Sequence, residues 1–155
     1  MNQRNQMFIH FDICIDRLNG AWRTLKTIKE HPGHPLVGSA FRFALVEYAV
    51  SYTRSDGPNK ERYRLDTRYV PVDFLPRHEH LLASRNQIQA HADLIIFDAK
   101  LSYIDHDGQR LVSIGLNNIN GFEELPHIDE IILLIEGTLE NMYADRDNLK
   151  LTLEP

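Results

Sequence analysis

Apolar residues recur at intervals of three and four over much of the chain, which is the periodicity of α-helices with one buried face. The spacing predicts helices over residues 6–30 and 36–53, and another that begins near Pro126, since proline suits a first turn. Residues 31–35, His-Pro-Gly-His-Pro, end the first helix because proline cannot continue the helical hydrogen-bond ladder. The predicted buried positions are Phe8, Phe11, Ile15, Leu18, Trp22, Leu25; Val37, Phe41, Ala44, Leu45, Tyr48, Tyr52; and Ile128, Ile131, Ile132, Ile135, Leu139, Met142.

A further helix is predicted between the second and the last of these. Asp73 is a favourable N-cap residue, and Pro76 is tolerated in the first helical turn. We expect this third helix to begin after Asp73 and to reach about His91.

Two short strands are predicted after the third helix. Residues 99–104 and 109–114 flank the sequence Asp-His-Asp-Gly at 105–108, which is typical of a tight hairpin turn. A chain of 155 residues can bury one core of its own. We therefore expect a single domain over residues 1–155, mainly all-α, with four helices and a small β-hairpin between helices 3 and 4.

The helix over residues 36–53 is apolar on nearly all sides. Phe43, Val46 and Val50 lie outside its main apolar stripe. Such a helix is either central in the fold or has one face covered by a partner subunit. The pattern therefore predicts a homodimer.

Composition restricts the location and the partners. The formal net charge of −5 does not favour charge-driven binding to duplex nucleic acid. The single cysteine, Cys14, cannot form an internal disulfide, which is typical of a reducing compartment. We find neither a secretory signal nor an apolar stretch of membrane-spanning length, and expect a cytoplasmic protein without membrane association.

Residues 54–68 are locally basic, with five basic side chains against three acidic ones. Tyr63 and Tyr69 lie among or beside them and offer rings on which unpaired bases can stack. One interpretation is a solvated loop; the other is a contact site for single-stranded RNA. In the second interpretation the RNA-binding residues are Arg62, Arg64 and Arg68.

Arg85 interrupts the apolar face of the third helix. At about 100° per residue it falls between Leu81 and Ile88, where a buried residue is expected. A buried arginine needs a paired charge, and Glu47 is a candidate partner. His91 lies on the flank of this face, about 120° from Arg85, so a second copy of the helix across a two-fold axis could complete a site.

Arginine and histidine together suit RNA cleavage without a metal. A histidine with a pKa near 6.5 can exchange a proton with the 2′-hydroxyl or the leaving 5′-oxygen of RNA. Arg85 can stabilise the phosphate as its charge builds, and Asn86 can orient either group. The alternative is structural: Arg85 pairs with an acid, and His91 caps the helix end.

The run Arg85-Asn86-Gln87-Ile88-Gln89-Ala90-His91-Ala92-Asp93 resembles the Arg-Asn-x4-His signature of the HEPN superfamily, in particular its abortive-infection and toxin-like branch. The resemblance implies a four-helix up-and-down bundle that dimerises, and a metal-independent endoribonuclease without a cofactor. It implies catalytic roles for Arg85 and His91, and supporting roles for Asn86 and Asp93. It also implies a possible nucleotidyltransferase-like antitoxin as partner. Non-catalytic members of this superfamily exist, so a nucleotide- or protein-binding dimer remains the alternative.

The remaining histidines offer a metal hypothesis that the spacing does not favour. His78 and His80, with His91 and Asp93, supply the right atoms for zinc. On a regular helix, however, His78 and His80 point about 160° apart and cannot bind one ion together. We expect no metal site.

Overall fold

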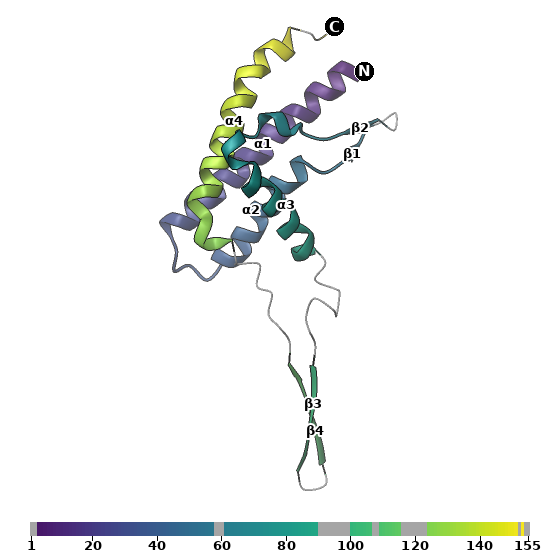
Figure 1. The fold of residues 1–155 in the computed structure, drawn as a ribbon, viewed down its shortest axis with the longest axis vertical. Coiled ribbons are helices and arrows are strands. Elements are labelled where there is room, and N and C mark those ends of the chain that lie inside the picture. The colour runs from purple at the N-terminus through teal and green to yellow at the C-terminus, as the bar shows by residue number, and fades with distance from the viewer. Residues whose placement is uncertain are drawn as a thin grey trace.

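The computed structural model describes residues 3–57, 61–89, 100–106, 109–115, 124–151 and 153, and only the backbone of residues 85–89 and 106. The fold is mainly helical (Figure 1). Its helices are α1 (Gln3–Glu30), α2 (Val37–Ser51), α3 (Leu75–Gln89) and α4 (Ile128–Lys150), with short 3-10 turns η1 (Thr67–Tyr69), η2 (Val72–Phe74) and η3 (Leu125–His127). Two antiparallel ribbons pair β1 (Ser55–Asp56) with β2 (Arg62–Tyr63), and β3 (Lys100–His106) with β4 (Gln109–Gly115).

The helices α1 and α4 pack side by side in opposite directions, so the start of α1 and the end of α4 lie at the same end of the molecule (Figure 1). A row of polar contacts follows this antiparallel register. Its pairs are Asp12 with Arg146, Asn19 with Tyr143, Trp22 with Glu136, and Lys29 with Asp129. These contacts fix the register of the two helices from Asp12 to Lys29 of α1.

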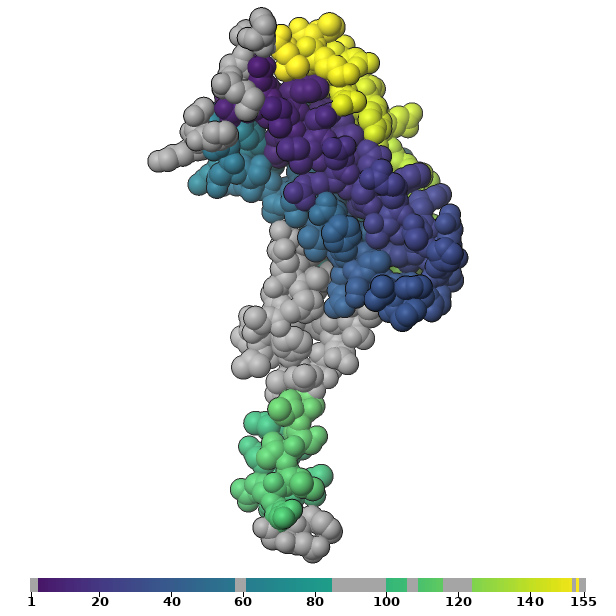
Figure 2. All heavy atoms as spheres, turned by 180° about the vertical axis from the view of Figure 1, so that it is seen from behind, coloured from purple at the N-terminus to yellow at the C-terminus, as the bar shows by residue number. Residues whose placement is uncertain are grey.

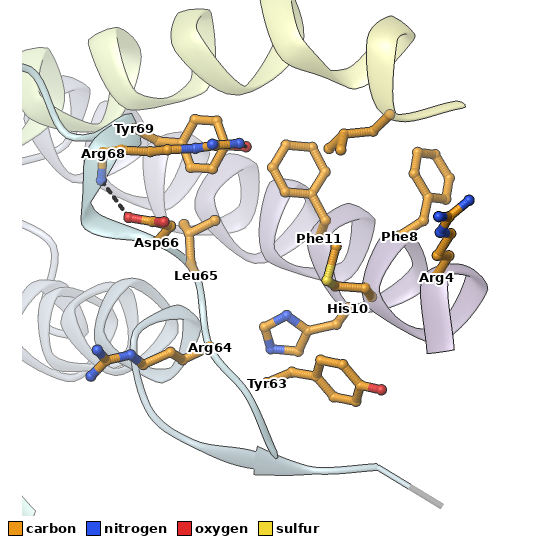
Figure 3. A pocket seen from close by; sticks show the side chains of 12 residues that line it. Arg4, Phe8, His10, Phe11, Tyr63, Arg64, Leu65, Asp66, Arg68 and Tyr69 are labelled. Atoms are coloured by element: carbon orange, nitrogen blue, oxygen red, sulfur yellow. Dashed lines mark hydrogen bonds between the residues drawn. The ribbon is translucent and has the colours of Figure 1, made fainter. Parts of the chain in front are cut away.

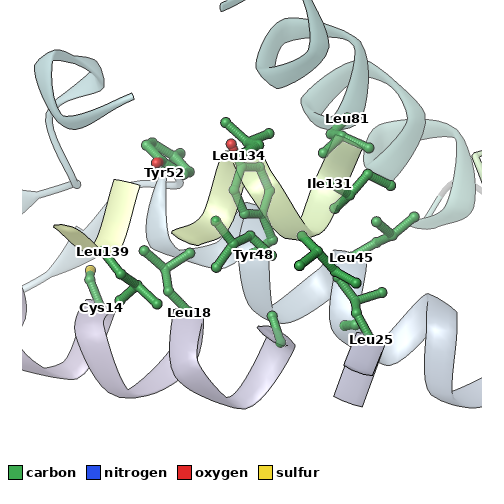
Figure 4. Packing of buried hydrophobic residues seen from close by; sticks show 14 of the residues in the cluster. Cys14, Leu18, Leu25, Leu45, Tyr48, Tyr52, Leu81, Ile131, Leu134 and Leu139 are labelled. Carbon is green, nitrogen blue, oxygen red and sulfur yellow. The ribbon is translucent and has the colours of Figure 1, made fainter. Parts of the chain in front are cut away.

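The helix α2 also runs antiparallel to α1. Arg17 of α1 pairs with Glu47 at 3.1 Å, and the thiol of Cys14, one turn earlier, donates to the carbonyl oxygen of Ser51 at 3.8 Å. The helix α3 packs against α2 and α4 in turn. Its Leu81 is 1% exposed and lies near Leu45 and Ile131 (Figure 4).

The predicted helices and their apolar stripes are confirmed. Nearly all of the predicted positions are buried in one core, and Phe8, Trp22, Val37 and Ile128 are half-buried at its edge. Pro76 lies in the first turn of α3, as expected. A one-sided apolar pattern was sufficient here because burial of that face stabilises each helix more than local propensity does.

Three local predictions were wrong. Asp73 is not the N-cap of α3, because it lies inside the 3-10 turn η2 that precedes the helix. Asp105 and His106 belong to strand β3 rather than to the turn, since the ladder continues to the pair His106–Gln109. The basic segment is not a plain loop: Ser55–Asp56 and Arg62–Tyr63 form a short ribbon.

Candidate functional site

The HEPN-like segment begins in the last turns of α3. The backbone of Arg85 and Asn86 is helical, whereas His91 and Asp93 lie outside the described residues. Position 85 follows the buried Leu81 by one helical turn and therefore lies on the core-facing side of α3. The acid proposed as a structural partner, Glu47, already pairs with Arg17.

A network of charged side chains joins the first turns of α3 to the start of α4. The carboxylate of Glu124, 4% exposed, accepts from Arg77 at 2.7 Å and lies 2.5 Å from Nε2 of His80. Arg77 also donates to Glu130 at 2.6 and 2.9 Å, and this contact lowers the pKa of the Glu130 carboxyl. His127 lies 3.5 Å from the same carboxylate. The network fastens α3 to α4, and sequence reasoning missed it because Glu124 is distant in the chain.

His78, two residues before His80, faces the opposite way into the core. Its Nδ1 lies 2.7 Å from the hydroxyl of Tyr48, and its ring meets that of Tyr52 edge-on at 4.4 Å. Burial lowers the pKa of His78, so the ring is neutral near pH 7. His78 thus contacts α2, whereas His80 contacts Glu124, which precedes η3.

An arginine- and aromatic-lined cavity of about 570 Å³ lies where the start of α1 meets residues 63–69 and the end of α4 (Figure 3). It is lined by Arg4, Met7, Phe8, His10, Phe11, Tyr63, Arg64, Leu65, Asp66, Arg68, Tyr69 and Leu149. Its rings are arranged in two contacts: Phe11 with Tyr69 at 5.3 Å between centroids, and His10 with Tyr63 at 5.8 Å. The volume is within the range usual for small-molecule sites, roughly 300–1,000 Å³.

Tyr69 is a fixed wall of this cavity. Its hydroxyl donates to Asp145 of α4 at 2.6 Å, and the guanidinium of Arg68 lies over its ring at 4.8 Å. Arg68 also pairs with Asp145 at 2.8 Å, so its charge is balanced. Asp66 accepts from the backbone N–H of Arg68 and caps η1.

The three arginines predicted to bind RNA are not equivalent. Arg64 and Arg68 line the cavity, whereas Arg62 lies outside it and forms an exposed pair with Asp56 at 3.6 Å. Sequence reasoning missed Arg4 and His10, which α1 supplies from more than fifty positions earlier. Burial and the charge of Arg17 lower the pKa of His10, which favours its neutral form.

The cavity and the described start of the HEPN-like segment, at the end of α3, lie at different ends of the helical body (Figure 1). The cavity is lined by the first turns of α1, around Phe8, whereas Leu25 of α1 lies near Leu45 and Leu81 (Figure 4). At 1.5 Å per residue, Phe8 and Leu25 are about 25 Å apart along α1. Within the described residues, the lining of the cavity and the level of Leu81 on α3 are therefore well separated.

The surplus apolar residues of α2 remain on the surface. Phe43 is 55% exposed, and Val46 and Val50 are half-buried. Beside them α1 exposes Ile9 and Ile13, and the two helices form one face of the molecule (Figure 2). Ile9, Ile13 and Val50 line one hollow together with the polar Arg17 and Ser51, and clustered apolar side chains of this kind are typical of interaction sites.

Comparisons with known proteins identify no relative: no family model, curated protein or solved structure matches the chain significantly. Among the described helices, none combines the length and the apolar character that crossing a membrane requires. In the same part of the chain, no three histidine, cysteine or acidic side chains lie together as a metal site would need.

Proposed function

We propose that the chain is a metal-independent endoribonuclease of HEPN type, built as an up-and-down four-helix bundle and active as a homodimer. The observation that supports this proposal is the helical backbone of Arg85 and Asn86 in the last turns of α3, with position 85 one turn after the buried Leu81. The antiparallel packing of α1 against α2 and against α4 is consistent with the bundle that the resemblance implies.

The chemistry assigns separate tasks to the motif residues. Arg85 holds the scissile phosphate and stabilises the charge that develops on its oxygens. His91 exchanges a proton with the 2′-hydroxyl or the leaving 5′-oxygen. The 2′-oxygen forms a bond to phosphorus while the bond to the 5′-oxygen breaks, giving a 2′,3′-cyclic phosphate and a 5′-hydroxyl. Asn86 and Asp93 orient these groups.

Arg62, Arg64 and Arg68 would contact the RNA backbone away from the reacting phosphate. The cavity lies about 25 Å along α1 from the level of Leu81. An RNA of several nucleotides could therefore contact both these arginines and the motif. A nucleotidyltransferase-like antitoxin remains the proposed partner of a toxin of this type.

Cleavage of labelled RNA in EDTA tests the proposal. Wild-type protein should cleave, and His91→Ala and Arg85→Ala should each lose roughly 100-fold or more of the rate, as for removal of a general acid–base group or a charge-stabilising one. Arg23→Ala is the matched control, because Arg23 is an exposed arginine of α1 outside the proposed site. Cleavage of equal rate in wild type and both motif variants refutes the assignment.

The dimer is tested at the exposed face of α1 and α2. Phe43→Glu should shift the protein from dimer to monomer in light scattering at micromolar concentration, because a buried unpaired carboxylate strongly opposes association. Leu133→Glu is the control: Leu133 is similarly exposed, on α4. A wild-type monomer at that concentration contradicts the homodimer.

The second candidate is a non-catalytic, HEPN-like dimer that binds a nucleotide or a protein. The arginine- and aromatic-lined cavity favours this candidate, because its rings and positive charges suit a bound ligand. Binding of that kind requires no reacting group. This candidate predicts saturable binding without any RNA cleavage.

A further inference from the structure

The cavity between α1, residues 63–69 and α4 combines flat apolar walls with positive charge at its rim. Phe8, His10 and Tyr63 are each half-buried, so part of each ring is accessible from the cavity. Phe11 and Tyr69 are buried behind them. Planar heterocycles bind between such rings by stacking and by burial of apolar surface.

The charge around the cavity is positive. Arg4, Arg64 and Arg68 face the carboxylates of Asp66 and Asp145, which leaves an excess of one positive charge. The helix α1 begins at this end and has no acidic residue in its first turn, so its positive dipole end adds to the attraction for an anion.

Arg64 is the cation that a ligand can recruit. Within the described residues, its exposed side chain has no hydrogen bond or ion pair. Its guanidinium points away from His10 and Tyr63 in Figure 3, so contact with a ligand beside those rings requires the side chain to rotate. Arg4 lies at the opposite rim, beside Phe8 (Figure 3).

We infer that this cavity binds a nucleoside 5′-monophosphate unit. The heterocycle lies against Phe8, His10 and Tyr63, and the phosphate meets Arg64 at the rim. The unit comes either from a free mononucleotide or from the 5′-phosphorylated end of an RNA chain.

This inference is separate from the proposed cleavage, because the cavity lies about 25 Å along α1 from the level of α3 that carries Leu81. It rests on the second candidate function and gives that candidate a ligand of stated chemistry. The bound nucleotide is therefore a separate ligand or a distant part of the RNA. Its binding requires no reaction at Arg85 or His91.

Calorimetric titration of the full chain tests the inference. The probes are AMP, GMP, CMP and UMP, with adenosine and inorganic phosphate as half-ligands, and tetranucleotides with and without a 5′-phosphate. We expect saturable binding of at least one monophosphate or of the 5′-phosphorylated tetranucleotide, and at least tenfold weaker binding of the half-ligands. Tighter binding of the free monophosphate than of the tetranucleotide identifies a mononucleotide as the ligand, and the reverse identifies an RNA end.

Variants locate the bound nucleotide. Arg64→Ala and Phe8→Leu should each weaken binding tenfold or more, whereas Arg54→Ala, an exposed arginine outside the cavity, should not. Thermal unfolding of each variant verifies the fold, and Arg64→Ala removes only an exposed side chain. Absence of saturable binding, or equal weakening in Arg54→Ala, overturns the inference.

Arg85→Ala separates this inference from the proposed function. Nucleotide affinity should stay unchanged in this variant, and its loss would place the nucleotide at the HEPN-like segment instead. A wild-type protein that binds nucleotide but does not cleave RNA supports the cavity and refutes the ribonuclease. A wild-type protein that cleaves RNA but binds no nucleotide supports the ribonuclease and refutes the inference about the cavity.

Discussion

Gly137 of α4 and Gly20 of α1 offer a test of the packing, because both lie inside long helices but in different surroundings. Replacing a helical glycine by alanine ordinarily stabilises a protein by roughly 0.5–1 kcal/mol, since alanine loses less backbone entropy on folding. A Cβ added at Gly20 meets no atom within 4 Å. We therefore expect Gly20→Ala to stabilise the protein by about that amount.

At Gly137 the same methyl group would lie 2.7 Å from Cγ of Pro71. The proline ring is rigid, and its segment is anchored to α4: Asn141 donates to the carbonyl oxygen of Tyr69 at 2.9 Å. Overpacking of this kind typically costs roughly 1–3 kcal/mol. After subtraction of the alanine gain, Gly137→Ala should destabilise the protein by up to roughly 2.5 kcal/mol.

Urea unfolding followed by circular dichroism measures both effects in one assay. The two glycine variants should move the midpoint in opposite directions, and in thermal unfolding each 1 kcal/mol corresponds to about 2–4 °C at this chain length. If Gly137→Ala stabilises the protein as much as Gly20→Ala does, the close contact between Pro71 and α4 is incorrect.

Three further predictions concern buried polar groups. Tyr48→Phe should lower the free energy of unfolding in urea by roughly 1–3 kcal/mol, because His78 then loses its buried partner. The control Tyr143→Phe, at an exposed tyrosine, should cost less than about 0.5 kcal/mol. Equal costs contradict the buried bond. Burial lowers the pKa of His78, so the unfolded state binds more protons in acid than the folded state does. The free energy of unfolding should therefore fall as pH drops below about 6.5. Replacing both Tyr48 and His78 by phenylalanine should weaken that pH dependence. Burial raises the pKa of Cys14 to about 11, so iodoacetamide at pH 8 should alkylate it only after unfolding, and rapid labelling of folded protein would refute its burial.

The sequence was informative about helices for a clear physical reason. The buried face of each helix is recorded directly in the spacing of apolar residues, so α1, α2 and α4 were predicted within a few residues. Boundaries were less reliable. The 3-10 turn around Asp73 and the extension of β3 to His106 depend on local hydrogen bonds that no apolar pattern records.

The two candidate sites differ in the same way: one consists of neighbouring residues in the chain, and the other of residues from distant segments. The Arg85–Asp93 run is a local string, and its resemblance to the HEPN signature needed only neighbouring residues. The structure adds the backbone position of Arg85 and Asn86, while the roles of the motif remain predictions. The cavity could not be predicted, because Arg4 and Phe8 meet Tyr63 and Tyr69 only after α1 has folded against the later segments.

By itself, the sequence determined the helical class, the buried stripes and the hairpin, because these follow from periodicity and turn chemistry within a few residues. Tertiary structure alone decided which charges meet: Arg77 with Glu124, Arg17 with Glu47, and Arg68 with Asp145. Spacing along the chain carries no information about such partners, since long side chains are brought together by the packing of whole helices. The same packing left Arg64 at the rim of a cavity whose walls come from three separate segments.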